Sequence, residues 1–199
     1  MLFELLATLC AGLFAGAAIY ITFVEHPARL ECGTELAATE FGPSYRRATL
    51  MQASLAAVGL LAALVAWAQG RGAEVLIGGL LLGVVIPFTL VVILPTNKRL
   101  LDPGLDRGSA EAAALLARWG RLHAVRSVVS ALAFVMLLWC LGAARLGLRS
   151  GGTLPERALE RKIGAGAAGV REMRFSPGSG GMVWHPIPLL RLIEGPDRG

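Results

Sequence analysis

Three residues just before the last apolar stretch have the types and spacing that proton chemistry requires. Trp119, His123 and Arg126 occur at positions i, i+4 and i+7, so a helix places them on one face. An imidazole is a general base that titrates near neutral pH, and a guanidinium stabilises a developing oxyanion. The indole offers a flat apolar surface to an aromatic ring. The pattern therefore predicts a site that abstracts a proton from an apolar compound or binds its polar end.

Other polar candidates lie at the ends of the remaining apolar stretches. His26 is an alternative base, Asn97 a second oxyanion donor, and Arg46 and Glu25 are candidate substrate contacts. Because polar groups at membrane depth need partners, we expect them to converge with the helix face in one pocket, with Glu25 or a bound anion pairing with Arg126. Taken singly, each has an ordinary interpretation: a tryptophan belongs to the interfacial belt, an arginine snorkels to headgroups, and a histidine satisfies local carbonyls.

Four long apolar stretches must position these residues. Each is close to the roughly 20 residues that a helix needs to cross a hydrocarbon core. Successive spans alternate in direction, so the candidate residues share one side of the membrane. The sequence predicts an all-α bundle of four transmembrane helices, and the stretches are Leu2–Val24, Ala48–Gln69, Val75–Leu94 and Val125–Leu146.

Proline and glycine indicate where the spans end. We expect the first span to end at Pro27 and the third to kink at Pro87 and end before Pro95. The segment 28–45 is predicted to connect the first two spans, with a short surface helix before Gly42-Pro43. A tight hairpin at residues 70–72 joins the second and third spans, and a helix that begins near Ser109 leads into the fourth.

Composition separates a membrane domain, residues 1–149, from a tail, residues 150–199. The chain is 55% hydrophobic with a mean hydropathy of +0.62, which is too apolar for one soluble domain of this length. The tail is rich in glycine and proline and has no sustained hydrophobic period, so we expect it to be disordered and basic. The net charge of +5 lies beside the spans and in the tail, where it fits anionic lipid rather than nucleic acid.

The sequence contains no pattern that is typical of a metal site. The cysteines Cys10, Cys32 and Cys140 have no CxxC spacing, and no cysteine or histidine spacing matches a zinc site. We expect neither a metal nor a bound cofactor. The spacings Gly12–Gly16 and Gly79–Gly83 favour close helix contacts, most simply within the chain, although association between copies is an alternative.

The distribution of basic residues predicts the orientation. The two connections on the polar side hold nine basic residues, and the opposite loop and the start of the tail hold three, so the polar side is predicted to face the cytoplasm. We expect a multi-pass protein of the cytoplasmic membrane of a bacterium, with both termini opposite the polar side. The nine are Arg29, Arg46, Arg47, Lys98, Arg99, Arg107, Arg118, Arg121 and Arg126, and the three are Arg71, Arg145 and Arg149.

Four motifs resemble the anthrone oxygenase-like family of small four-helix membrane proteins, over about residues 5–147. The most specific are a Pro-Thr-Asn segment followed by Trp-x3-His-x2-Arg. The motifs are Gly12-Leu-Phe-Ala-Gly16-Ala-Ala-Ile-Tyr20, Glu25-His26-Pro27-Ala28-Arg29, Pro95-Thr96-Asn97-Lys98-Arg99-Leu100 and Trp119-Gly-Arg-Leu-His123-Ala-Val-Arg126. Some members oxidise polyketide anthrones to anthraquinones with molecular oxygen and no bound cofactor.

The resemblance implies oxidation of a hydrophobic aromatic or quinol-like substrate. An anthrone methylene is acidic, so His123 would act as the base, with His26 as an alternative. Arg126 and Asn97 would stabilise the enolate oxygen, and Trp119 would stack on the rings. Two alternatives stay open, namely a non-catalytic protein that binds a lipid or quinone headgroup and a small structural subunit that associates through its glycine faces.

Overall fold

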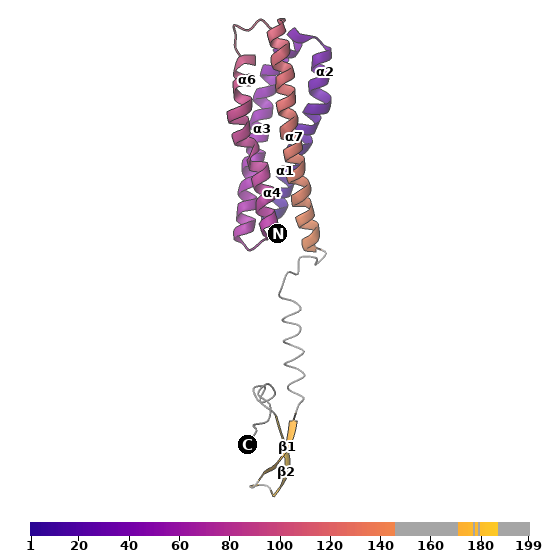
Figure 1. Ribbon diagram of the computed structural model, residues 1–199, viewed down its shortest axis with the longest axis vertical. Helices are drawn as coiled ribbons and strands as arrows, with labels where there is room; N and C mark the ends of the chain where they lie inside the picture. The colour runs from indigo at the N-terminus through magenta and orange to yellow at the C-terminus, as the bar shows by residue number, and fades with distance from the viewer. Residues whose placement is uncertain (146–170, 177, 179, 187–199) are drawn as a thin grey trace, which may run out of the picture. The chain divides into compact units, whose positions relative to one another are not determined.

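The prediction of an all-α, four-span bundle is confirmed. The computed structural model describes residues 1–145, 171–176, 178 and 180–186 (Figure 1). Four helical segments in it are long and apolar enough to cross a membrane, which indicates an integral membrane protein. They are Leu2–Glu31, Thr34–Ala68, Ala73–Leu100 and Ala110–Ala143.

The first segment continues beyond the proline at which we expected it to end. It consists of α1 (Leu2–Tyr20), the π-helical turn η1 (Ile21–Glu25) and α2 (His26–Glu31). In the wide turn, the His26 amide donates to the Ile21 carbonyl. Pro27 has no amide hydrogen to donate, and in a regular α-helix its ring would clash with the carbonyl four residues earlier. The wider π-helical turn makes room for the ring. The helix therefore passes through Pro27 instead of stopping there.

The second segment, α3 (Thr34–Ala68), also differs from the expected connection. It begins directly after Cys32 and Gly33 and includes Pro43, so there is no separate surface helix. Gly33 has a φ of +93°, a conformation that favours glycine and allows the sharp reversal. The residues that we assigned to a loop therefore form the first turns of a long helix.

The third segment breaks near Pro87, as expected, but continues past Pro95. It consists of α4 (Ala73–Gly83), α5 (Val85–Phe88), a second π-helical turn η2 (Thr89–Ile93) and α6 (Leu94–Leu100). The break at Val84 lies where Pro87 leaves the Gly83 carbonyl without a helical donor. As before Pro27, a π-helical turn precedes Pro95 and lets the helix proceed.

The fourth segment, α7 (Ala110–Arg145), begins where the sequence predicts. The Ser109 hydroxyl accepts a hydrogen bond from the Ala112 amide at 3.1 Å, which caps the helix. In the preceding loop, Asp102 and Asp106 each accept a bond from the glycine two residues later. This start leads one long helix without a break from the polar end into the membrane.

Small residues let the helices approach closely. A Cβ atom on Gly79 would lie 2.2 Å from the Ala63 Cβ, and one on Gly12 would lie 2.9 Å from the Phe134 ring. These glycines therefore mediate contacts within the chain, the simpler of the two interpretations of their spacing. Gly16 has no heavy atom within 4 Å of such a position, so it does not contribute.

The two ends of the bundle differ in character. Figure 1 shows α2 and α6 at one end, and the N-terminus with the α3–α4 connection at the other. At the N-terminal end, Glu4 is fully buried and its Oε2 lies 3.3 Å from Arg71 Nε. The C-terminal end of the described part of α7 also lies there, whereas the C-terminus itself lies outside the described residues.

The tail contains a hairpin that sequence analysis did not predict. Strands β1 (Arg171–Ser176) and β2 (Gly181–Pro186) pair antiparallel, with Met173 opposite Trp184. Gly180, with a φ of +67°, lies in the connection. The sequence has no sustained hydrophobic period here, so its pattern does not indicate this pairing. The expectation for residues 150–170, 177, 179 and 187–199 lies outside the described residues.

Candidate functional site

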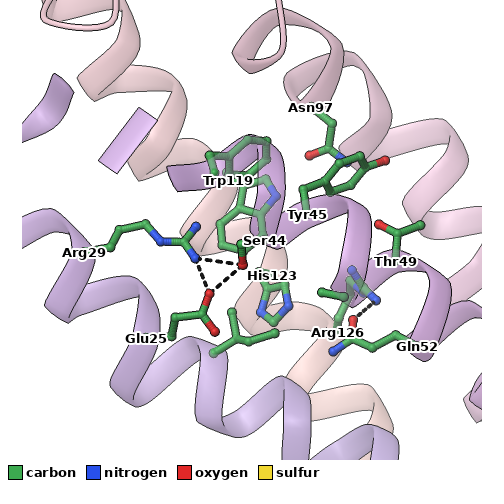
Figure 2. Close-up of a pocket in the computed structure, with 13 residues that line it drawn as sticks. Glu25, Arg29, Ser44, Tyr45, Thr49, Gln52, Asn97, Trp119, His123 and Arg126 are labelled. Atoms are coloured by element: carbon green, nitrogen blue, oxygen red, sulfur yellow. Dashed lines mark hydrogen bonds and ion pairs between the residues drawn. The ribbon is translucent and has the colours of Figure 1, made fainter. Parts of the chain in front are cut away.

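A small polar cavity of about 20 Å³ lies at the end of the bundle that carries α2 and α6 (Figure 2). All four helical segments contribute to it. Of the predicted residues, it brings together Glu25, Asn97, Trp119, His123 and Arg126. We call it the polar cavity, and its other lining residues are Ile21, Arg29, Phe41, Ser44, Tyr45, Ala48, Thr49 and Gln52.

His123 is held by a chain of hydroxyl groups. Its Nδ1 lies 3.1 Å from Thr22 Oγ1, which lies 2.8 Å from Ser127 Oγ, and Ser127 Oγ lies 2.9 Å from the Ala18 carbonyl oxygen. The imidazole is 2% exposed. Thr22 lies in the π-helical turn η1, so this turn places the hydroxyl that bonds to the ring.

The direction of this chain assigns the protons. A carbonyl only accepts, so the single Ser127 proton points to a carbonyl oxygen, either that of Ala18 at 2.9 Å or that of His123 at 3.3 Å. Ser127 then accepts from the Thr22 hydroxyl, whose single proton is used, and Thr22 must accept from Nδ1–H of His123. The neutral imidazole therefore carries its proton on Nδ1 and its lone pair on Nε2, the tautomer that can take up a proton at Nε2.

Trp119 contacts groups of the protein itself. Its ring stacks on His123 with centroids 4.7 Å apart and meets the Phe41 ring edge-on at 5.4 Å. The guanidinium of Arg29 lies over it at 5.9 Å. The indole is 6% exposed, so it is buried and does not belong to an interfacial belt. These contacts position the imidazole plane.

Arg126 has no ion pair with a carboxylate among residues 1–145. Its Nη2 donates to Gln52 Oε1 at 2.7 Å, and its guanidinium lies 5.4 Å from the centroid of the Phe14 ring. Both partners are neutral. The side chain lines the polar cavity, so its positive charge is available to an anionic or oxygen-bearing ligand there.

Glu25, the partner that we expected for Arg126, pairs with Arg29 instead. The Arg29 guanidinium bonds to Glu25 Oε1, and its Nε lies 2.7 Å from Glu40 Oε2. Ser44 donates to the same Glu25 oxygen at 2.7 Å (Figure 2). Two carboxylates thus compensate Arg29, and the cluster leaves Arg126 as the cavity's uncompensated cation in the described chain.

Asn97 is 1% exposed, and neither polar atom of its side chain has a hydrogen-bond partner in the described protein. The same holds for Gln52 Nε2 and Arg126 Nε. A buried amide without partners costs free energy, by about 1–3 kcal/mol for each group. Asn97 lines the polar cavity, so these groups suit a ligand that offers oxygen atoms.

Two predicted residues lie elsewhere. Arg46 is exposed and does not line the polar cavity. His26 is buried behind Trp119, with ring centroids 5.1 Å apart, and it does not line the cavity either. Gly120 makes this position possible, because a Cβ atom there would lie 2.5 Å from His26 Nε2.

Several lining residues were missed by sequence analysis. Tyr45, Thr49 and Gln52 occur at i, i+4 and i+7 on one face of α3, and this spacing was a signal for them. It was hidden because we assigned Tyr45 to a loop. Arg29 was counted toward orientation and as part of one motif but not as a site residue, and nothing in its sequence context indicates which of several acidic residues it pairs with.

Among the described residues, no group of three histidine, cysteine, aspartate or glutamate side chains is placed to hold a metal ion. The polar cavity instead combines one imidazole, one uncompensated guanidinium and one amide without partners. These groups can take up a proton and stabilise negative charge on oxygen.

Comparison with known families gives one match. Residues 41–136 match the family model described as anthrone oxygenase. The matched region is shorter than the resemblance over residues 5–147. It contains Gln52, Asn97, Trp119, His123 and Arg126 but not the first helical segment. Comparisons with curated proteins and with solved structures give no match.

Proposed function

We propose that this anthrone oxygenase-like chain oxidises an apolar aromatic compound with an acidic C–H bond, using molecular oxygen. One observation carries the proposal. His123, with its lone pair on Nε2, and Arg126, without a carboxylate partner in the described chain, line the same buried cavity. A base and an unpaired cation together favour a reaction in which a proton leaves carbon and negative charge develops on oxygen.

The first step is proton transfer. His123 Nε2 takes a proton from a methylene that lies between two aryl rings and is conjugated through them with a ketone carbonyl on the opposite side of the central ring. The electron pair of the broken C–H bond delocalises onto the carbonyl oxygen as an enolate. Arg126 and Asn97 donate hydrogen bonds to that oxygen, and they act more strongly on the enolate than on the neutral ketone. The imidazolium formed keeps its Nδ1–H bond to Thr22.

Oxygen then reacts with the electron-rich enolate. One electron passes to O₂, and the resulting superoxide and carbon radical combine to form a C–O bond. Protonation by the His123 imidazolium gives a hydroperoxide. Loss of the second C–H proton and cleavage of the O–O bond release water and leave a carbonyl. The balance is CH₂ plus O₂ giving C=O plus H₂O, so O₂ is the only oxidant that the proposal requires.

Trp119 and the Arg29 cluster are positioning residues in this mechanism. Trp119 stacks on the imidazole and limits its rotation, while the hydroxyl chain from Thr22 orients Nδ1. Glu25 and Glu40 compensate the charge of Arg29, so the cluster stabilises the cavity wall. The Arg29 guanidinium then does not compete with Arg126 for the enolate oxygen. Pre-organisation of this kind lowers the reorganisation needed in the transition state.

The test measures oxygen consumption by purified protein with a model anthrone, corrected for spontaneous oxidation in detergent alone. We expect His123→Gln to lower kcat by about 10²-fold or more. His26→Gln, the matched control outside the cavity, should retain most of the activity. Chelators should not change the rate. Equal rates for wild type and His123→Gln would rule out His123 as the base.

The uncompensated charge of Arg126 also favours a second candidate, a non-catalytic protein that binds an anionic headgroup. A permanent anion would satisfy the guanidinium as well as a transient enolate does. In that case the purified protein would retain such a molecule, and wild type would consume no oxygen above the detergent background. Release of the molecule in Arg126→Gln would identify its binding site.

A further inference from the structure

A second, apolar cavity of about 100 Å³ lies beside the polar cavity, deeper along the spans. It lies between α3 and the third helical segment. We call it the apolar cavity. Its lining residues are Phe14, Tyr45, Thr49, Gln52, Ala53, Ala56, Val85, Ile86, Thr89, Leu90, Leu94 and Arg126.

The two cavities share one wall. Tyr45, Thr49, Gln52 and Arg126 line both of them. The hydrogen bond from Arg126 to Gln52 crosses this wall, and Figure 2 shows both side chains meeting there. Neither the guanidinium nor the amide takes part in an ion pair in the described chain, so a ligand that displaces these side chains breaks a single hydrogen bond between them.

The volumes show that neither cavity alone holds a polycyclic ligand. The polar cavity, at about 20 Å³, holds little more than one water molecule by the usual requirement of roughly 10–15 Å³. A cavity of roughly 150 Å³ takes up one benzene ring. The polar cavity therefore accommodates only one edge of an aromatic substrate. The two cavities together fall short of the volume of one ring by this measure, so the remaining rings of a polycyclic ligand lie in the open side of the apolar cavity.

The open side of the apolar cavity faces lipid. Ala53 and Leu90 line it and are exposed, Leu90 by 58%, yet both lie well inside segments that span the membrane. Nearer the opposite end of the bundle, the α3–α4 contact is closed, because Gly79 meets Ala63 and Gly83 meets Leu60. The helix break at Val84 ends this close contact.

We infer that the substrate is an amphiphile that reaches the site from the bilayer, between α3 and the α5–η2 part of the third segment. Its oxygen binds Arg126 at the shared wall, the methylene edge of its central ring faces His123 in the polar cavity, and its other rings extend through the apolar cavity toward the opening. The inference rests on the proposed function for the identity of the ligand as an aromatic ketone. The binding geometry follows from the shared wall and the lipid-facing opening.

The first test measures binding without turnover. Wild type and variants in nanodiscs are equilibrated with a model anthrone under argon, and bound ligand is counted above that of empty nanodiscs. Ala53→Phe should weaken binding at least tenfold, because it fills the opening. Val128→Phe, the control at an exposed position on α7, should bind within twofold of wild type. Equal binding by Ala53→Phe and wild type would overturn the inference.

A second variant and a second readout guard against misfolding. Thr89→Leu adds bulk on the opposite wall, and it should weaken binding in the same way as Ala53→Phe. Below saturation, doubling the lipid at constant total substrate should halve the rate in wild type, because the substrate is diluted in the bilayer. A rate that follows the aqueous substrate concentration would place the route at the polar end instead.

The outcomes separate this inference from the proposed function. Loss of binding in Ala53→Phe together with unchanged turnover in His123→Gln would support the cavity and overturn the base. Unchanged binding in Ala53→Phe together with lost turnover in His123→Gln would support the base and overturn the cavity.

Discussion

At the scale of single residues, the site is defined by which partner each polar side chain has. Arg29 has two carboxylates, whereas Arg126 has one neutral amide. His123 has a hydroxyl at Nδ1 that leads to a backbone carbonyl through Ser127. Arg29 is therefore a structural cation, whereas the charge of Arg126 is available to a ligand. The hydroxyl chain selects one tautomer of the His123 imidazole.

Thr22 tests the tautomer assignment. Thr22→Val keeps the shape but removes the acceptor for Nδ1–H, so the imidazole is free to place its proton on Nε2. We expect kcat to fall about tenfold with little change in KM, because the base acts only in the transition state. Thr22→Ser retains the hydroxyl and should restore most of kcat. A drop in Thr22→Ser as large as in Thr22→Val would assign Thr22 to packing alone.

Substitution of Arg126 tests whether its guanidinium makes directed hydrogen bonds to Gln52 and to a ligand oxygen. Arg126→Lys keeps the charge but loses the planar fork that reaches Gln52 and a ligand oxygen together. We expect kcat/KM to fall about 10–100-fold, the range of one lost charged hydrogen bond. The rate measured with Arg46→Lys, an exposed arginine outside the cavity, should not change. Full activity in Arg126→Lys would indicate that only charge matters.

At the scale of elements, two π-helical turns shape the polar end. Each ends two residues before a proline, η1 before Pro27 and η2 before Pro95. The wide turn carries the helix through the proline and shifts the rotation of the residues around it. Thr22 and Glu25 lie in η1, and Asn97 follows η2, so both turns place residues of the site.

Pro27→Ala tests the role of the first turn. Alanine restores an amide donor, so an α-helical register becomes available and would rotate Thr22 away from His123. We expect thermal stability to rise or stay level while turnover falls, measured on the same preparation. Equal turnover for Pro27→Ala and wild type would mean that the turn persists without the proline.

The α3–α4 contact gives a prediction about stability. Gly79→Ala would place a Cβ atom 2.2 Å from that of Ala63, so the helices must separate. Overpacking of this kind costs about 1–3 kcal/mol. Gly16→Ala is the matched control, because that position is open and alanine favours a helix by about 1 kcal/mol. Melting temperatures in one detergent should fall for Gly79→Ala and not for Gly16→Ala.

At the scale of the whole molecule, the candidate site and a stabilising ion pair lie at opposite ends of the four-span unit. The end with α2 and α6 carries the polar cavity, and the other end carries the pair of Glu4 and Arg71. Glu4 is fully buried in α1, and Arg71 lies in the α3–α4 connection and remains partly exposed. The pair therefore stabilises the contact between α1 and the α3–α4 connection, far from the polar cavity.

Arg71→Ala should destabilise the bundle without changing chemistry. It leaves the Glu4 carboxylate without its cation, and we expect a loss of about 1–3 kcal/mol, less than for a pair in which both groups are buried. Turnover per folded molecule should equal that of wild type. Glu4→Gln in the Arg71→Ala background should recover part of the melting temperature, because it removes the unpaired charge. A lower turnover per folded molecule in Arg71→Ala would show that the Glu4–Arg71 pair also affects the polar cavity at the opposite end.

The sequence by itself determined the class of fold, the number of spans and the end that carries the polar residues. Every backbone group in lipid must be bonded within the chain, so about 20 apolar residues admit few structures other than a helix. Alternating direction then places residues near positions 25, 97 and 123 at one end. The predicted neighbours Asn97, Trp119, His123 and Arg126 follow from this rule and from helical spacing.

Only the tertiary structure decided which groups pair. The choice of Arg29 over Arg126 as the partner of Glu25 depends on distances of a few ångströms between different helices, which helical periodicity does not specify. The same holds for His26, which lies behind Trp119 because Gly120 leaves room for it. From sequence, the prolines at positions 27, 43 and 95 predict helix ends. In the structure the helices continue through them, because packing against neighbouring helices and the π-helical turns compensate for the missing hydrogen bonds.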